Sequence, residues 1–311
     1  MTELQRQLRA EDLPEVRRIL QMLFHDDGYA DIARLNGMTN RTYKVTRHDG
    51  CAYVVRLPGE GTAALINRAD ERKSTRLACK LGIDTELLHF GDDGVKVMRF
   101  VPEPQPMSEA VLRREDILTQ AAAIFHRLHT CGEDTGVRFE VFEMADAYEN
   151  IIRENQVALY DDYAAVRQTV ADIKADVDRM GAARRVPCHN DALVGNWVLG
   201  QSGELFLVDW EYSGMNEAMW DLSCLSIEAE YAARHDDLLL RAYYGRDISA
   251  DERKRFVAAK LYVDTLWTLW GLTRVPYEGA FMQEYADFRY ARLKRNIDAY
   301  RCIACVDADE T

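Results

Sequence analysis

The chain has no run of about 18 apolar residues, and charged residues stand among the first of its sequence, MTELQRQLRAEDLPEV. We therefore expect neither a membrane span nor a signal peptide. Basic residues are in deficit, with 39 Lys and Arg against 52 Asp and Glu, so the net charge is −13. An acidic surface repels phosphate backbones and anionic lipids. The composition thus disfavours nucleic acid and membranes as partners and suits a cationic small molecule.

Cysteine is scarce and scattered. The seven cysteines, an odd number, indicate reduced thiols and a cytoplasmic protein. Cys302 and Cys305 form a single CxxC without a second pair or a nearby histidine, so we expect no metal there. His126 and His129 also lack a third ligand in the nearby sequence, and we interpret them as structural histidines.

The first hundred residues mix strands with helices. Residues 12–24 place apolar side chains at helical spacing, which predicts an amphipathic helix. Strand-like runs on either side of residues 48–50 predict a β-hairpin, and a second hairpin is predicted to turn at residues 92–94. Between the hairpins, residues 62–82 predict a helix that ends at a glycine. We therefore expect a small antiparallel sheet that carries one helix.

Three of the seven prolines lie in PEPQP at residues 102–106, where the pattern becomes mostly helical. We expect a hinge here, between an N-terminal lobe of residues 1–101, with a leading helix at about 10–24, and a helical lobe of residues 107–311. Helical patterns in the second lobe cover residues 108–131, 143–180, 217–245, 251–271 and 278–300. The predicted fold class is α+β, with two lobes.

One extended segment interrupts the helical pattern, CHNDALVGNWVLGQSGELFLVDWEY at residues 188–212. NWVL and ELFLVDW flank a turn, which predicts a hairpin that brings Asn196 close to Asp209. Amide and carboxylate oxygens suit Mg²⁺, and Asp191 is then free to orient a hydroxyl group. Phosphoryl transfer requires this combination. The alternative is that these residues serve only in turns and helix caps, where Asp and Asn are common.

This segment resembles the catalytic and metal-binding loops of the small-molecule kinases related to protein kinases. The resemblance lies in HND at residues 189–191, in Asn196, and in DWE at residues 209–211. It is most similar to the bacterial choline kinases of the choline/ethanolamine kinase family, and the match extends from about residue 30 to about residue 275. The family has a bilobal protein-kinase-like fold and uses ATP and Mg²⁺, which we expect here.

The resemblance assigns roles to the loop residues. Asp191 is expected to be the catalytic carboxylate, and Asn196 and Asp209 are expected to bind the metal. Glu211 is either a second metal ligand or a solvated side chain. His189 and Asp221 are expected to brace the catalytic loop. Asparagine at 190 and Trp-Glu at 210–211 depart from the protein-kinase pattern, which disfavours protein substrates.

Nucleotide contacts are expected in the N-terminal lobe. Arg56 stands where protein kinases have their phosphate-binding lysine, and Glu71 on the next helix is expected to pair with it. Each alone would be interpreted as an ordinary surface charge. The adenine is expected between the lobes, near Phe100 and Val101. The loop that covers the phosphates is expected to comprise Asn36, Gly37, Met38, Thr39 and Asn40.

The acceptor site is expected near the C-terminus. Trp267 and Trp270 lie three residues apart on one helical face, a spacing that is usually typical of a core. In choline kinases a Trp-x-x-Trp forms part of a cage around the trimethylammonium group, and Glu228 fits the family's nearby carboxylate. Tyr212 is taken as a further substrate contact. The sequence leaves open which aromatic side chains among Tyr212, Trp220 and Tyr231 face the pocket.

Choline is the expected acceptor, and ethanolamine, thiamine or an aminoglycoside are the alternatives within the same fold. Thiamine also carries a quaternary nitrogen, whereas an aminoglycoside pocket should contain many carboxylates. A pseudokinase that binds without chemistry is the alternative outside enzymes. It is disfavoured because Asp191, Asn196 and Asp209 are all present. The sequence does not predict the oligomeric state.

Overall fold

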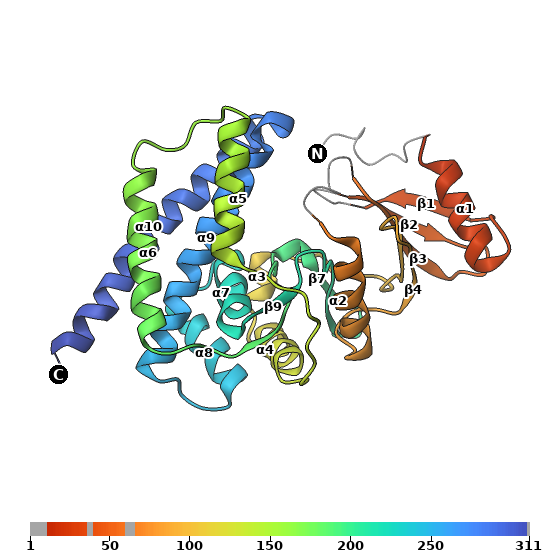
Figure 1. The fold of residues 1–311 in the computed structure, drawn as a ribbon. Coiled ribbons are helices and arrows are strands. Elements are labelled where there is room, and N and C mark those ends of the chain that lie inside the picture. The colour runs from red at the N-terminus through yellow and green to blue at the C-terminus, as the bar shows by residue number, and fades with distance from the viewer. Residues whose placement is uncertain (1–10, 36–39, 60–65, 310–311) are drawn as a thin grey trace. The chain divides into compact units, whose positions relative to one another are not determined.

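The computed structural model describes residues 11–35, 40–59 and 66–309, with side chains described as far as residue 302. The chain groups into two compact units. Figure 1 shows the fold, coloured by residue number from red at the N-terminus to blue at the C-terminus. The first unit comprises residues 1–107 and 195–213, and the second unit comprises residues 108–194 and 214–311. The lobe and hinge boundaries expected from the proline-rich segment stay a prediction.

A five-stranded antiparallel sheet forms the centre of the first unit, in the order β1-β2-β3-β5-β4 (Figure 1). Its strands are β1 (Asp31–Arg34), β2 (Arg41–Thr46), β3 (Ala52–Leu57), β4 (Leu87–Phe90) and β5 (Lys96–Arg99). The β2–β3 and β4–β5 pairs confirm the two hairpins predicted around residues 48–50 and 92–94.

Two helices accompany this sheet. Helix α1 (Leu13–Phe24) buries Val16, Ile19 and Leu20 against the apolar side chains of β2 and β3, as its amphipathic pattern predicts. Helix α2 (Arg68–Lys80) begins later than the prediction from residue 62. The side chain of Asn67 caps it by accepting two backbone N–H groups, so the helix starts at the next residue.

The hairpin predicted in the catalytic segment is confirmed, and it belongs to the first unit. It comprises β7 (Trp197–Leu199) and β8 (Leu205–Leu207), preceded by a short 3₁₀ turn at Val194–Asn196. Two backbone hydrogen bonds join it to the rest of the unit. Leu207 N–H donates to the carbonyl of Ile83 (3.1 Å), and Gln105 N–H donates to the carbonyl of Leu199 (2.8 Å).

The second unit is mostly helical. Its helices are α3 (Glu109–Leu112), α4 (Glu115–His129), α5 (Val141–Glu154), α6 (Tyr163–Arg179), α7 (Ala218–Glu228), α8 (Ala233–Tyr244), α9 (Ala250–Glu278) and α10 (Ala280–Asp309). Helix α9 runs through the middle of this unit and packs against α5, α6, α7 and α10 (Figure 1). A two-stranded antiparallel ribbon of β6 (Arg185–Cys188) and β9 (Gly214–Glu217) carries the loop that contains Asp191.

Several long helical patterns are interrupted where the sequence pattern predicts continuity. The pattern at 143–180 forms α5 and α6, and the pattern at 217–245 forms α7 and α8. Single residues with a left-handed backbone lie at these breaks, Gln156 at φ 57° and Glu230 at φ 52°. Helix α9 continues to residue 278 and is followed by Gly279 at φ 64°. One left-handed residue is sufficient to end a helix without changing its apolar periodicity.

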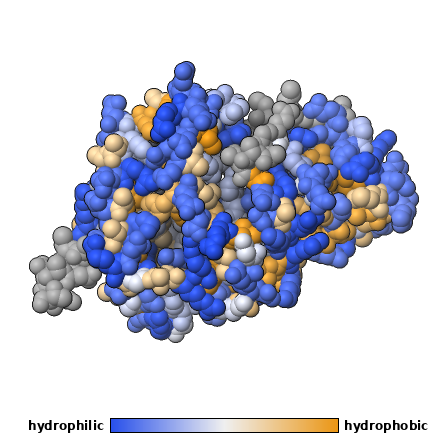
Figure 2. All heavy atoms as spheres, in the orientation of Figure 1, coloured by the Kyte–Doolittle hydropathy of each residue, from blue (hydrophilic) through white to orange (hydrophobic). Residues whose placement is uncertain are grey.

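Hydrophilic residues cover most of the face drawn in Figure 2, in agreement with the charged composition of the chain. Among the residues that the structure describes, none of the helices is long and apolar enough to cross a lipid bilayer.

Candidate active site

The β7–β8 hairpin places Asn196 and Asp209 at its base. The carbonyl of Asn196 accepts a hydrogen bond from Val208 N–H (2.9 Å), so the two residues lie on neighbouring chain segments, as the hairpin predicts. Strand β8 ends at Leu207, two residues before the predicted end. Asp209 follows with a left-handed backbone at φ 67°, which ends the strand pairing.

Arg56 and Glu71 form the ion pair that the sequence predicts. Both guanidinium Nη atoms of Arg56 donate to the two carboxylate oxygens of Glu71, with Nη2 at 2.9 Å from Oε2, and both side chains are buried. Burial alone would raise the pKa of Glu71, but the charges of Lys96 and Arg56 outweigh it and lower the pKa to about 2. Glu71 therefore remains a carboxylate at every pH at which the protein is expected to work.

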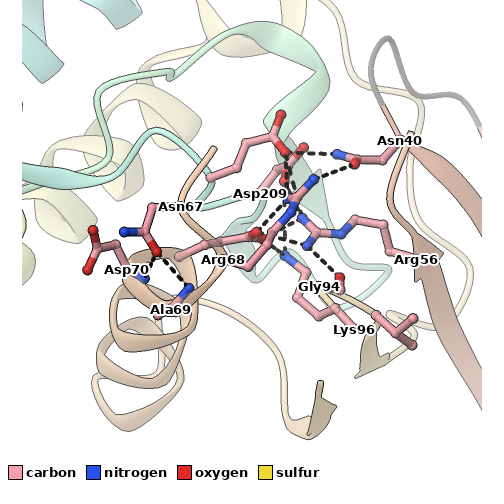
Figure 3. A network of polar contacts seen from close by, with 12 residues as sticks. Asn40, Arg56, Asn67, Arg68, Ala69, Asp70, Gly94, Lys96 and Asp209 are labelled. Carbon is pink, nitrogen blue, oxygen red and sulfur yellow. Dashed lines mark hydrogen bonds and ion pairs between the residues drawn. The ribbon is translucent and has the colours of Figure 1, made fainter. Parts of the chain in front are cut away.

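Two further cations contact Glu71, and sequence reasoning missed both. Lys96 Nζ lies 3.2 Å from Glu71 Oε1, and Arg68 Nη1 lies 2.7 Å from Glu71 Oε2. Figure 3 shows Arg56, Arg68 and Lys96 converging on one network. Arg56 and Lys96 are direct partners across β3 and β5, an arrangement of like charges that is unfavourable unless an anion lies between them. The i, i+3 spacing of Arg68 and Glu71 was the available sequence signal.

The same network reaches the residues expected to bind metal. Arg56 Nη1 lies 3.3 Å from Asp209 Oδ1, and Arg68 Nη1 lies 3.4 Å from Glu211 Oε2. Asn40 also donates to Glu211, from Nδ2 to Oε2 at 2.9 Å. Only 4% of the side chain of Glu211 is exposed, so the alternative of a solvated glutamate does not hold. Burial, followed by the charge of Asp209, raises the pKa of Glu211.

Gly94 allows Arg56 and Arg68 to lie close to its backbone. Its carbonyl accepts a hydrogen bond from Arg56 Nη2 at 3.1 Å. Its backbone is left-handed at φ +85°, and a Cβ at this position would lie 2.8 Å from Cδ of Arg68. A side chain here would therefore strain the backbone and collide with Arg68.

Asp209, Glu211 and Asn196 fit a hard divalent cation. They offer two carboxylates and one amide, the oxygen donors that Mg²⁺ prefers when phosphate and water complete its coordination. The carboxylates of Asp209 and Glu211 are near enough to raise the pKa of Glu211, and Arg56 partly neutralises both.

The predicted nucleotide contacts are described only in part. Asn36, Gly37, Met38 and Thr39 lie outside the described residues, and Asn40 is buried beside Glu211. Phe100 N–H donates to the carbonyl of Ala52 at 3.1 Å, which fixes the backbone at the end of β5. Val101 follows it and is 8% exposed. Their contact with adenine stays a prediction.

Asp221 braces the catalytic loop in the second unit, as the sequence predicts. Its Oδ2 accepts the N–H of His189 and its Oδ1 accepts the N–H of Asn190, both at 2.7 Å. The N–H of Asp191 donates to Nδ1 of His189 at 3.2 Å, which gives that histidine a structural role. The backbone of three consecutive residues is thereby held from within the core.

Asn190 replaces the arginine of protein kinases with a buried amide. Its backbone is left-handed at φ 68°. Its side chain accepts a hydrogen bond from Asn216 (3.0 Å), and its carbonyl accepts one from Trp220 Nε1 (2.9 Å). The indole N–H of Trp220 is thus used inside the fold, and the hydroxyl of Tyr231 likewise donates to the carbonyl of Leu112. These contacts give Trp220 and Tyr231 structural roles.

Two acids of the predicted acceptor site, Asp191 and Glu228, influence the same buried side chains of the second unit. Burial raises the pKa of the Cys224 thiol, and the charges of Glu228 and Asp191 raise it further. Burial also raises the pKa of Tyr285, where Arg289 opposes the same two carboxylates. Burial and Asp191 raise the pKa of Tyr148. Asp191 and Glu228 therefore act on one common region of the second unit.

Trp267 and Trp270 form a corner beside that region. Their ring centroids lie 5.9 Å apart with the planes at 83°, and Trp270 meets Tyr285 of α10 in a similar edge-to-face contact, also at 5.9 Å. Gly271 makes room for this tyrosine, since a Cβ there would lie 2.8 Å from Cδ1 of Tyr285. Both tryptophans are 3% exposed. Tyr212, in the first unit, is also buried.

Glu228 has a cationic partner that sequence reasoning missed. Arg289 Nη2 donates to Glu228 Oε1 at 2.6 Å, and Arg289 is 3% exposed. Asp264 is buried in the same cluster and contacts both Arg289 and Arg292. The two acids and two arginines balance each other in charge. Because these residues lie on α7, α9 and α10, sequence spacing gave no signal for the pairing.

Comparison with known proteins identifies the family. A family model described as choline/ethanolamine kinase matches residues 33–291, most of the chain. The chain belongs to the choline/ethanolamine kinase family. It is therefore a small-molecule kinase, a phosphotransferase, and the resemblance inferred from the HND, Asn196 and DWE motifs is confirmed at the level of the family.

Individual relatives agree with this membership in the choline/ethanolamine kinase family. Protein LicA of Haemophilus influenzae is 28% identical over 272 residues, which cover 83% of this chain and 76% of the relative. A solved choline/ethanolamine kinase family protein from Mesorhizobium loti is 33% identical, with a TM-score of 0.79 over 93% of this chain and 99% of its own.

The solved choline kinase LicA of Streptococcus pneumoniae is 27% identical, with a TM-score of 0.83 over 94% of this chain and 100% of its own. The fold of this family member is accordingly the protein-kinase-like fold that choline kinases share with aminoglycoside phosphotransferases. The predicted fold class, an antiparallel sheet followed by a mostly helical part, is confirmed.

Proposed function

We propose that this kinase transfers the γ-phosphate of ATP to the hydroxyl group of choline, with Mg²⁺ as cofactor. The observation that carries the choice of acceptor is the edge-to-face corner of Trp267 and Trp270, which continues to Tyr285. A region rich in aromatic rings suits a cation without N–H groups, since such a cation is recognised by ring faces rather than by hydrogen bonds.

The alternatives fit this region less well. The primary ammonium of ethanolamine needs several hydrogen-bond acceptors, which the ring faces of this region do not supply. An aminoglycoside carries several ammonium groups and needs several available carboxylates, whereas Asp264 is paired with arginine. Thiamine has a quaternary nitrogen and shares the aromatic preference, so it must be tested directly.

The reaction follows from the roles of the side chains. Asp191 accepts the proton of the choline hydroxyl group. At the same time the hydroxyl oxygen of choline forms a bond to the γ-phosphorus, and the bond between the γ-phosphorus and the departing ADP oxygen breaks. Arg56 is held by Glu71 through both of its Nη atoms and supplies a fixed positive charge for the phosphates. Asn196, Asp209 and Glu211 would hold the metal. When bound, Mg²⁺ neutralises charge that develops on the phosphates.

A phosphorylation assay with radiolabelled ATP and Mg²⁺ tests this function on choline, ethanolamine, thiamine and an aminoglycoside. We expect choline to have the highest kcat/KM. Asp191→Asn should keep nucleotide binding and lose about 10² to 10⁴-fold in turnover. Asp161→Asn, at an exposed aspartate of the same unit, is the matched control and should behave as the parent. Equal use of ethanolamine, or turnover by Asp191→Asn within a few-fold of the parent, would contradict the proposal.

A further inference from the structure

A chain of three buried side chains lies beneath the loop that carries Asp191. Tyr243 of α8 contacts His129 of α4 at 2.9 Å from the hydroxyl oxygen to Nδ1, and His129 Nε2 contacts Asp221 Oδ2 at 3.1 Å. The three residues are 7%, 2% and 0% exposed, respectively. His129 also stacks on Phe125 with the rings 5° from parallel, so its ring plane is fixed by packing.

The hydrogen-bond partners determine where the protons lie. The Asp221 carboxylate can only accept, and it already accepts the backbone N–H groups of residues 189 and 190. His129 must therefore donate from Nε2. Its Nδ1 is then the acceptor of the neutral ring, and the donor to it is the hydroxyl of Tyr243. A single tautomer of His129, protonated at Nε2, satisfies both its contact with Asp221 and its contact with Tyr243.

The same cluster offers a set of metal-ligating atoms, but the hydrogen bonds argue against a metal. Nitrogen of His129, sulfur of Cys188 and oxygen of Asp221 lie within 4.8 Å of one another. Both oxygens of Asp221 already accept hydrogen bonds, and burial raises the pKa of Cys188, which opposes the thiolate that a metal requires. The cluster is better explained as a hydrogen-bonded support for the loop.

We propose that His129 and Tyr243 are positioning residues for the phosphoryl transfer. The imidazole of His129 holds the Asp221 carboxylate in the orientation that binds two loop amides, and the Tyr243 hydroxyl selects the tautomer that allows this. The loop then presents Asp191 to the acceptor hydroxyl. This inference rests on the proposed function, in which Asp191 accepts the hydroxyl proton.

The loop requires such support because it carries strain. Asn190 is left-handed at φ 68°, a conformation that a residue with a Cβ adopts at a cost. Without the His129 donor, the Asp221 carboxylate is a buried charge with an unfilled acceptor site, and it gains by turning away from the loop amides. A small displacement of a catalytic group is sufficient for a large loss of rate.

Two substitutions of His129 distinguish a role in supporting the Asp221 carboxylate from a role in core packing. The amide nitrogen of glutamine in His129→Gln reaches the place of Nε2 and keeps the donor to Asp221. The shorter asparagine in His129→Asn reaches only the place of Nδ1 and loses that donor. His25→Asn, at an exposed histidine of the first unit, is the control. Tyr243→Phe keeps the ring and removes only the hydroxyl group.

The measurements are kcat, the KM values for ATP and choline, the melting temperature, and hydrogen exchange at the amides of residues 189–191. We expect His129→Asn to lose about 10- to 100-fold in kcat with nearly unchanged KM values, and to raise exchange at those amides. His129→Gln should retain most of the kcat and the protection. The kcat and the amide protection of Tyr243→Phe should lie between those of the two His129 variants, because His129 can then also adopt its other tautomer.

Three results would overturn the proposal. The first is a kcat for His129→Asn equal to that of the parent. The second is an equal loss in His129→Gln and His129→Asn, which would indicate packing alone. The third is unchanged exchange at residues 189–191 in His129→Asn. If the parent phosphorylates none of the acceptors, the proposed function fails, and the exchange measurement alone then decides whether His129 supports the loop.

Discussion

The carboxylate of Glu228 accepts a hydrogen bond from the guanidinium group of Arg289, 2.6 Å away and 61 positions later in the sequence. The acid expected to attract the substrate is thus already neutralised by the protein. Removing one partner of a buried ion pair leaves the other charge uncompensated, which typically costs more than the pair contributes. If Glu228 contributes to the acceptor site as proposed, this pair couples acceptor recognition to the stability of the second unit.

We expect Glu228→Gln to lower the melting temperature by roughly 5 to 10 °C, because Arg289 loses its nearest anion. It should also raise the KM for choline, because the proposed acceptor region loses a carboxylate. The double variant Glu228→Gln, Arg289→Gln should recover much of the melting temperature without recovering the KM. Thermal melts and steady-state kinetics measure both effects. Glu230→Gln, at an exposed neighbour, is the control. A double variant as unstable as the single one would show that the pair does not carry the effect.

The Trp267–Trp270 corner predicts a selective effect on the acceptor. Replacing either tryptophan with leucine should raise the choline KM by roughly 2- to 30-fold, the range expected for one cation–π contact, while the KM for ATP changes little. Phe256→Leu, at a buried position of the same helix, should lower the melting temperature without changing the choline KM. Equal increases in both KM values for the tryptophan variants would indicate that these residues serve only in the core.

Asp209 predicts a metal-dependent effect on nucleotide affinity. Asp209→Ala should weaken the binding of ATP in the presence of Mg²⁺, since it removes one carboxylate of the metal site, and should leave binding in EDTA nearly unchanged. Isothermal titration with and without Mg²⁺ measures the difference. Asp92→Ala, at an exposed aspartate of the same unit, serves as control. If the parent binds ATP equally well with and without the metal, this assignment is wrong.

A buried carboxyl group in the first unit predicts a dependence of stability on pH. Burial raises the pKa of Asp84 to about 6, although Lys96 opposes the shift. The folded protein holds this proton more tightly than the unfolded chain, so the stabilising effect is present at low pH and is lost as the pH rises through about 6. Asp84→Asn should therefore melt at a higher temperature than the parent at about pH 8, with a smaller difference at about pH 4.

Melting curves at the two pH values, with Asp92→Asn as control, test this dependence. The amide keeps an oxygen for the backbone N–H of Thr85, which now donates to Asp84 Oδ1 at 2.6 Å. A constant difference between Asp84→Asn and the parent at both pH values would show that the ionisation of Asp84 has no part in it.

Local patterns were sufficient to predict much of the site. Turn residues and strand-like runs predicted the hairpin that places Asn196 beside Asp209, and the family resemblance predicted the Arg56–Glu71 pair. Both depend on short-range spacing or on a known motif. The existence of most helices was predicted for the same reason.

What the sequence could not predict depends on tertiary contacts. Lys96 and Arg289 read as ordinary charges, because nothing in their neighbourhood along the chain shows that each faces a buried acid. The helix breaks at Gln156 and Glu230 were missed because single left-handed residues do not disturb an apolar pattern. These features required the packed structure.

The backbone at Asp209 has a consequence for engineering this kinase. Asp209 has φ 67°, where a Cβ is unfavourable and glycine is not. Glycine would relieve the backbone at this position, but it would discard the carboxylate that lies 3.3 Å from Arg56 Nη1. Asn190 has a similar backbone conformation, but its side-chain amide is hydrogen-bonded in the core. At position 190, glycine would relieve the backbone but would lose that hydrogen bond. A directed-evolution programme that seeks thermostable variants must score turnover in every round, because a change at position 209 that eases the backbone also removes a carboxylate of the proposed metal site.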